Sequence, residues 1–174
     1  ANLFATFGFE TLDNLLTYFL LVLFVLMVHS CLTLPLMLKT LTGLSPLTFY
    51  RNVRPALLFG FSTASSNASL PVTLETAVKH LGIRNTIAAF TNPLGATINM
   101  DGTAIMQGVA TVFIAQVYNI DLSITQYLMV IITATLASIG TAGVPGVGLI
   151  MLAMVLKQIG LPVEGIALII GVDR

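Results

Sequence analysis

The sequence predicts an all-α integral membrane protein, in which transmembrane helices combine with two opposed re-entrant helical hairpins. Of the 174 residues, 56% are hydrophobic and only 8% are charged, whereas a water-soluble domain carries about 25% charged residues. The charges divide the chain into uncharged stretches of membrane-spanning length. Two of these stretches are interrupted by clusters of Ser, Gly and Pro. We therefore expect most of the surface to face lipid.

Charge and cysteine content restrict the classes of partner. Seven Lys and Arg balance seven Asp and Glu, so no electrostatic attraction to nucleic acid or to an acidic membrane surface is indicated. The single cysteine, Cys31, lies in an apolar run and is expected to pack as a small hydrophobic residue. The chain begins at Ala1 and stops at Arg174 within an apolar segment, so we expect it to be a piece of a longer membrane protein.

The clearest spanning helix is predicted over residues 14–38, which carry no charge. At about 1.5 Å of rise per residue this stretch extends roughly 37 Å, enough to cross a hydrocarbon core of about 30 Å with some tilt. Pro35 is expected to kink the helix near its end. His29, a lone ring on an apolar helix, is expected to be packed or hydrogen-bonded rather than to relay protons.

The next apolar region predicts a re-entrant hairpin instead of a crossing helix. Its centre, residues 61–71, is crowded with Ser, Thr and Asn and ends in Pro71. Short hydroxyl and amide side chains compete for backbone hydrogen bonds, so helix propensity is low there. Helical patterns flank this centre at about 46–60 and 71–81. Two half-length helices with a polar tip enter and leave a membrane on the same side.

A second hairpin is predicted within residues 122–156. This uncharged run would extend about 52 Å as one helix, which exceeds the bilayer. The predicted break is at residues 138–148, which contain four glycines and a proline. A pair of apolar segments interrupted in this way is a sequence signature of a transporter built from inverted repeats, with its binding site at the interruptions.

Charge placement predicts that the two hairpins open on opposite sides. Five basic residues flank the ends of the first hairpin: Lys39, Arg51, Arg54, Lys79 and Arg84. The ends of the second carry Asp121, Lys157 and Glu164. The excess of basic residues places the first set in the cytoplasm. Residues 86–118 then cross the membrane between the two sets, and the tips meet near the midplane.

The crossing segment is itself interrupted, between Asn92 and Thr103, and carries Asp101 about midway along its length. A carboxylate at the bilayer centre costs at least about 2.5 kcal/mol, so we interpret it as functional. Asn99, Thr97 and Thr103 add neutral oxygens beside it, and Gly102 loosens the backbone. Hard cations prefer such all-oxygen shells. The sequence therefore predicts a cation site here.

Three segments resemble the dicarboxylate/amino acid:cation symporter family, the glutamate transporters. They are residues 62–71 (STASSNASLP), 99–103 (NMDGT) and 137–146 (ASIGTAGVPG), in the order and spacing of that family. The resemblance identifies the chain as part of a transport domain. It implies that residues 10–40 are a transmembrane helix, 46–82 the first hairpin, 86–118 a broken transmembrane helix, 122–160 the second hairpin or gate, and 163–174 the start of the last helix.

The same resemblance implies site residues. Sodium ions would be held by Gly95, Thr97, Asn99, Asp101, Ser138, Ile139 and Thr141. Substrate would be held by Ala64, Ser65, Ser66, Thr103, Val144 and Gly148. Some archaeal members have an arginine at the position of Ala64. The family's substrate-binding residues of the last helix lie beyond Arg174, which is itself expected to be a variable position.

The function that the resemblance implies is secondary active symport by alternating access, not enzymatic catalysis. The substrate would be an acidic or neutral amino acid or a C4-dicarboxylate, coupled to cations, with Na⁺ favoured and no other cofactor. A multi-pass protein of the plasma (inner) membrane is expected, in contact with lipid and forming a homotrimer through a scaffold domain absent from this chain. Two alternatives remain, a proton-coupled dicarboxylate symporter and a channel-like pore lined by paired re-entrant loops.

Overall fold

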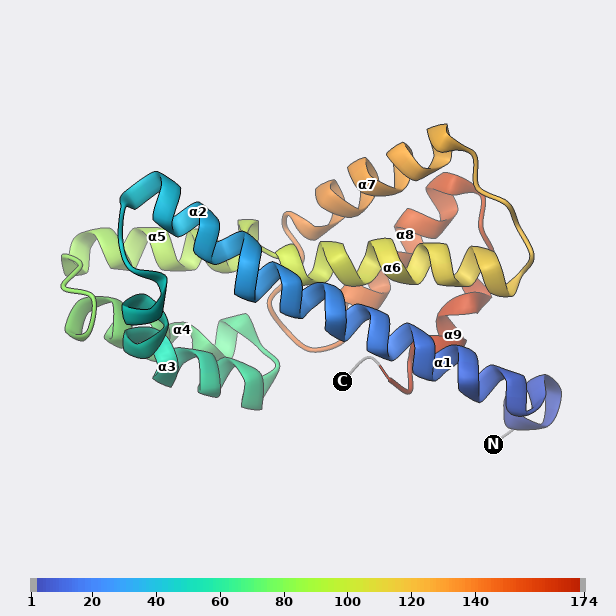
Figure 1. Ribbon diagram of the computed structural model, residues 1–174, viewed down its shortest axis with the longest axis horizontal. Helices are drawn as coiled ribbons and strands as arrows, with labels where there is room; N and C mark the ends of the chain where they lie inside the picture. Colours follow the sequence, from blue (N-terminus) through green and yellow to red (C-terminus); the bar gives the residue numbers. More distant parts are fainter. Residues whose placement is uncertain (1–2, 173–174) are drawn as a thin grey trace. The chain divides into compact units, whose positions relative to one another are not determined.

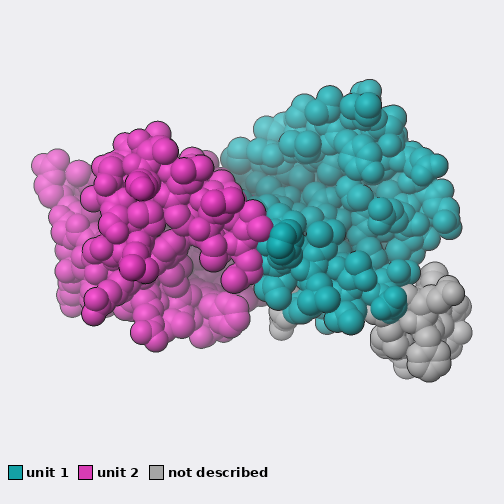
Figure 2. Space-filling model, viewed as in Figure 1, with its two compact units in different colours: residues 1–26, 101–139, 148–174 teal, residues 27–100, 140–147 magenta. Residues whose placement is uncertain are grey.

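The computed structural model describes residues 3–172, with side chains from residue 13 onward, and every regular element in this range is helical. The predicted all-α class is confirmed. The chain divides into two compact units (Figure 2). Unit 1 comprises residues 1–26, 101–139 and 148–174, and unit 2 comprises residues 27–100 and 140–147.

The first helical stretch joins α1 (Leu3–Val28), the π-helical turn η1 (His29–Thr33) and α2 (Leu34–Thr42) (Figure 1). Within the described residues, Asp13–Thr42 is the one helix long and apolar enough to cross a membrane. It contains the span predicted over residues 14–38. The π-helical turn η1 lies just before Pro35, the residue where a kink is predicted. The stretch ends at Gly43, whose φ of +71° forms a left-handed cap.

Unit 2 contains α3 (Pro46–Thr63), α4 (Ser66–Lys79) and α5 (Asn85–Ile98). Helix α4 packs against both α3 and α5. Only Ala64 and Ser65 separate α3 from α4, so the predicted helical limits at 60 and 71 are wrong. The hydroxyls of this polar segment do not break the helices. They donate hydrogen bonds to backbone carbonyls instead; Ser69 Oγ, for example, donates to the Ser65 carbonyl at 2.7 Å.

Capping residues explain why the turn between α3 and α4 is so short. Ala64 adopts a φ of +47° and its N–H donates to the Gly60 carbonyl, which ends α3. Ser65 then has an extended backbone, and its Oγ accepts a hydrogen bond from the Ala68 N–H at 3.2 Å. That bond is the usual N-cap interaction and starts α4 one residue later.

Unit 1 contains α6 (Asp101–Val117), α7 (Ile124–Ser138), α8 (Val147–Ile159), the 3₁₀ turn η2 (Val163–Gly165) and α9 (Ile166–Ile169). Ser123 and Gln126 form a capping box that starts α7. The break predicted within 138–148 is present, because α7 ends at Ser138 and α8 begins at Val147. Of the segment expected to start the last helix, residues 173–174 lie outside the described residues.

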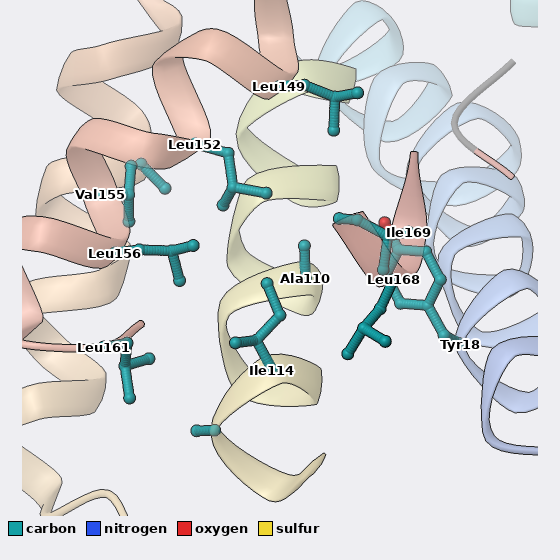
Figure 3. Close-up of a cluster of buried hydrophobic side chains, with 12 residues drawn as sticks. Tyr18, Ala110, Ile114, Leu149, Leu152, Val155, Leu156, Leu161, Leu168 and Ile169 are labelled. Atoms are coloured by element: carbon teal, nitrogen blue, oxygen red, sulfur yellow. The ribbon is translucent and has the colours of Figure 1, made fainter. Parts of the chain in front are cut away.

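The hydrophobic core of unit 1 is built around α6. Figure 3 shows Ala110 and Ile114 of α6 between the side chains of α8 on one side and those of α9 with Tyr18 on the other. Ile114, Leu152 and Ile169 are completely buried. Small and branched side chains on α6 therefore allow two elements to pack on it at once.

A prediction about stability follows from the contact between η2 and α6. A Cβ added at Gly165 would lie 2.5 Å from Ile114 Cγ2, which is buried and cannot move away. We expect Gly165→Ala to destabilise the protein by about 1–3 kcal/mol, the usual cost of overpacking a core. Gly108→Ala is the control, because nothing lies within 4 Å of an added Cβ there. Equal thermal midpoints for the two variants would contradict the packing described.

Candidate functional site

The break between α7 and α8 contacts the turn between α3 and α4 in unit 2. The Gly143 carbonyl accepts two hydrogen bonds, from Ser65 Oγ at 2.7 Å and from the Asn67 N–H at 3.0 Å. The expected contact between the two helix breaks is confirmed. Both donors lie at the start of α4. The Gly143 carbonyl therefore links two distant segments, since Ser65 and Gly143 are 78 positions apart in sequence.

Gly143 fits this contact because it has no side chain. A Cβ there would lie 2.8 Å from Ser66 Cβ and 3.0 Å from Asn67 Oδ1. Real Cβ atoms do not approach other heavy atoms so closely, and Ser66 Cβ is attached to the backbone and cannot rotate away. The two breaks can therefore lie this close together only with glycine at position 143.

A second contact joins the same segment to the end of α5. The Gly140 N–H donates to the Thr97 carbonyl at 3.0 Å, one residue before α5 ends at Ile98. Thr97 Oγ donates to the Leu94 carbonyl at 2.9 Å, so its hydroxyl is used within the helix. Thr141, next to Gly140, is buried at 3% exposure. Two predicted cation ligands, Thr97 and Thr141, thus belong to one contact region of unit 2.

An open cavity of about 510 Å³ lies in unit 2 between the first turn and α5. Five of the predicted site residues line it: Ala64, Ser65, Ser66, Gly95 and Asn99. Its other polar lining residues are Ser69, Thr73, Thr91 and Asn92. No lining residue carries a charge, so the cavity offers hydroxyls, amides and carbonyls.

Asn92 is a cavity residue that sequence reasoning did not select as a site residue. Its Nδ2 atom is buried and has no hydrogen-bond partner among the described residues. An amide on α5 within an apolar stretch was the available signal, but its burial could only be seen once α4 and α5 were packed together. A buried donor without an acceptor costs free energy unless a ligand or water supplies one.

We expect Asn92→Leu to preserve or raise the stability of the protein without ligand. Leucine has a similar volume and removes the unpaired donor, which costs about 1–3 kcal/mol when buried. Thermal unfolding in detergent measures this. Asn85→Leu, at the exposed start of α5, is the control, because it adds apolar surface without removing a buried amide. A large loss of stability in Asn92→Leu alone would show that the amide has a structural partner.

The chain breaks again between α5 and α6, at Asn99 and Met100. Asn99 has φ −94° and ψ +63°, outside the helical region, and its N–H donates to the Gly95 carbonyl at 2.9 Å. Asp101 is the first residue of α6, where the helix dipole stabilises a negative charge. Thr103 follows on the same first turn of α6.

Thr103 and Gly148, both predicted to bind substrate, lie close together in unit 1. A Cβ added at Gly148 would lie 3.3 Å from Thr103 Cγ2 and 3.1 Å from Met106 Cε. The Gly148 carbonyl also accepts a hydrogen bond from Gln107 Nε2 at 3.1 Å. Gln107 is completely buried, and sequence reasoning missed it. Its position four residues after Thr103, on the same face of α6, was the only signal.

The remaining predicted residues have local roles. Ser138 is buried at the end of α7, and its Oγ donates to the Thr135 carbonyl at 2.8 Å. Ile139 follows it and is exposed. Val144, next to Gly143, is exposed, and its N–H donates to the Ala142 carbonyl at 2.8 Å.

The carboxylates of the described residues do not form a cluster. Among the described residues, no group of three or more His, Cys, Asp or Glu side chains is close enough to hold a metal ion. A cation bound by these residues would therefore be held mainly by neutral oxygens, with at most a few carboxylates. Na⁺ accepts such a ligand set, because it is a hard cation of single charge.

Comparison with known proteins decides the family. The family model described as "Sodium:dicarboxylate symporter family" matches residues 1–174. The chain belongs to this family. The resemblance stated from the three motifs is thus confirmed over the whole chain.

Curated relatives agree with this assignment. Excitatory amino acid transporter 5 of Mus musculus is 48% identical over 148 residues, which is 85% of this chain and 26% of that protein. An excitatory amino acid transporter of Caenorhabditis elegans is 43% identical over 164 residues, 94% of this chain and 33% of that protein. Excitatory amino acid transporter 1 of Rattus norvegicus is 43% identical over 160 residues, 92% and 30% respectively. The chain thus spans about a third or less of the length of these symporter relatives.

Proposed function

We propose that this chain forms part of the transport core of a sodium-coupled symporter for an acidic or neutral amino acid or a C4-dicarboxylate. The observation that carries the proposal is the contact of two helix breaks at the Gly143 carbonyl. Broken helices at membrane depth are tolerated only where they are buried in protein or line a cavity. The family and the names of the relatives support transport as the purpose of that arrangement.

Helix lengths support two re-entrant hairpins. Helix α3 has 18 residues, α4 has 14, α7 has 15 and α8 has 13. At about 1.5 Å per residue they extend roughly 20–27 Å, short of a hydrocarbon core of about 30 Å. Pairs α3–α4 and α7–α8 would therefore enter the membrane and return. Basic residues at the ends of α3–α4 favour a cytoplasmic opening for that pair, and the second pair would open on the opposite side.

Coupling would depend on Asp101 and on carbonyls released by the helix breaks. We infer one site with the Gly95 carbonyl and the Asn99 side chain, and a deeper one with Asp101 and Asn99. A further site would use carbonyls of Thr97, Ser138, Ile139 and Thr141. A cation beside Asp101 would neutralise the carboxylate, so the loaded core could cross the apolar region at lower cost than the empty, charged one.

Substrate would lie near the N-termini of two helices. Helix α4 begins at Ser66 and α8 at Val147, and the N-terminus of a helix favours negative charge. Ala64, Ser65 and Ser66 would contribute from the first break, Thr103 from α6, and Val144 and Gly148 from the second. Amino acids and dicarboxylates share a carboxylate, the kind of negative group that a helix N-terminus favours.

The protein is proposed to be a multi-pass component of the plasma (inner) membrane and a homotrimer assembled through a scaffold domain. The apolar composition and the spanning-length helix support a membrane location.

Calorimetry of the full-length protein with aspartate, glutamate, alanine and succinate tests the proposal. We expect one of these to bind only when Na⁺ is present, with proton concentration having little effect. Binding that follows pH and ignores Na⁺ would favour a proton-coupled symporter. No saturable binding of any member of the panel, in Na⁺ or at low pH, would favour a pore.

A further inference from the structure

The backbone hydrogen bonds of the first helical stretch change register at η1. In an α-helix an N–H donates to the carbonyl four residues earlier. In η1 the spacing is five, so the Leu34 N–H donates to the His29 carbonyl. A register change of this kind leaves one carbonyl to be satisfied by another group.

That carbonyl belongs to Ser30. Its α-helical donor would be the Leu34 N–H, which is already used by His29. Its π-helical donor would come from residue 35, which is Pro35 and has no N–H. The combination of a π-helical turn and a proline five residues after Ser30 therefore leaves the Ser30 carbonyl without a donor from its own helix.

A side chain from α3 supplies the missing donor. The Tyr50 hydroxyl donates to the Ser30 carbonyl, across 20 residues of sequence. Tyr50 lies one turn after α3 begins at Pro46, and the left-handed cap at Gly43 turns the chain back so that α3 packs against α2. Both Tyr50 and Ser30 are half-buried. All of these residues belong to unit 2.

We propose that Ser30, Pro35 and Tyr50 form an interlock that fixes the long apolar helix to the start of α3. Ser30 lies within the stretch of spanning length, where little water is available to replace a lost donor. Because Pro35 creates the unpaired carbonyl, the contribution of the Tyr50 hydroxyl depends on Pro35. The interlock would make residues 28–50, from the end of α1 to the first turns of α3, move as one body. This inference goes beyond the proposed transport function.

A double-mutant cycle in the full-length protein, reconstituted in phospholipid nanodiscs, tests the interlock. The variants are Tyr50→Phe, Pro35→Ala and their combination, with Tyr118→Phe as a matched control on an exposed tyrosine. We expect Tyr50→Phe to lower the thermal midpoint by about 3 °C or more and Tyr118→Phe to leave it unchanged. With Ala at position 35, its N–H can pair with the Ser30 carbonyl, so Tyr50→Phe should then have little effect.

Hydrogen exchange gives a local measurement that does not need the Pro35 variants. In Tyr50→Phe, amides in residues 28–38 should exchange about fivefold faster or more, as expected for the loss of one hydrogen bond. Two results would overturn the interlock. One is an equal loss of stability from Tyr50→Phe with Pro or Ala at position 35. The other is unchanged exchange in residues 28–38.

Discussion

Asp101→Asn is expected to abolish or strongly weaken sodium-dependent substrate binding in the full-length protein. A neutral amide cannot balance a cation where the dielectric constant is low. Two unit charges about 4 Å apart interact by about 4 kcal/mol at an effective dielectric constant of 20, which corresponds to roughly a thousandfold in affinity. Substrate titrations at fixed Na⁺, and Na⁺ titrations at fixed substrate, measure the effect.

The control for this prediction is Asp121→Asn. Asp121 is exposed between α6 and α7, outside both helices, so its neutralisation should leave Na⁺ dependence intact. The Asp101→Asn protein should still fold, because Asp101 lies at the exposed start of α6. Wild-type Na⁺ dependence in Asp101→Asn would remove Asp101 from the coupling mechanism.

Gly143→Val is expected to separate the two helix breaks and weaken substrate binding by at least about tenfold, or roughly 1.4 kcal/mol. The first atom of any side chain there would overlap Ser66 Cβ and lie 3.1 Å from the Asn67 backbone nitrogen. The segment would have to move away, which would break the hydrogen bonds from Ser65 and Asn67 to the Gly143 carbonyl. Gly143→Ala should produce the same defect, because the overlap begins at Cβ.

A suitable control for Gly143 needs an ordinary backbone and open space. Gly160 is unsuitable because its φ of +80° strains any larger residue. Gly108 is helical with nothing within 4 Å of an added Cβ, so Gly108→Val is the matched variant. Calorimetry measures the substrate affinity of both variants. If Gly143→Val and Gly108→Val reduce it equally, the contact between the two helix breaks has no part in binding.

Much of the fold could be predicted from charge spacing and helix breakers. The uncharged run at 14–38 and the Gly and Pro residues at 138–148 are one-dimensional features, and they correspond to a spanning-length helix and a real break. The first break was predicted too wide. Residues such as Ser65 and Ser69 are unfavourable for helices on average, but here they cap α4 or bond to helix carbonyls.

Only those parts of the site that depend on local backbone conformation could be predicted from the sequence. A broken helix at Asn99 and a glycine-rich second break can be recognised from residue types alone. The burial of Asn92 and Gln107 depends on which helices pack on α5 and α6, and sequence spacing does not encode that. The π-helical turn before Pro35 could not be predicted from sequence spacing either. The carbonyl that it leaves unpaired, that of Ser30, accepts a hydrogen bond from Tyr50, 20 residues away.

Uptake into proteoliposomes that contain the full-length protein tests most directly whether this chain serves sodium-coupled symport. Radiolabelled aspartate, glutamate, alanine or succinate would be added outside, with an inward Na⁺ gradient. We expect one of them to accumulate above its external concentration, with saturable kinetics, and to lose this accumulation when choline replaces Na⁺. Non-saturable uptake that only equilibrates, with or without Na⁺, would contradict symport and support a pore.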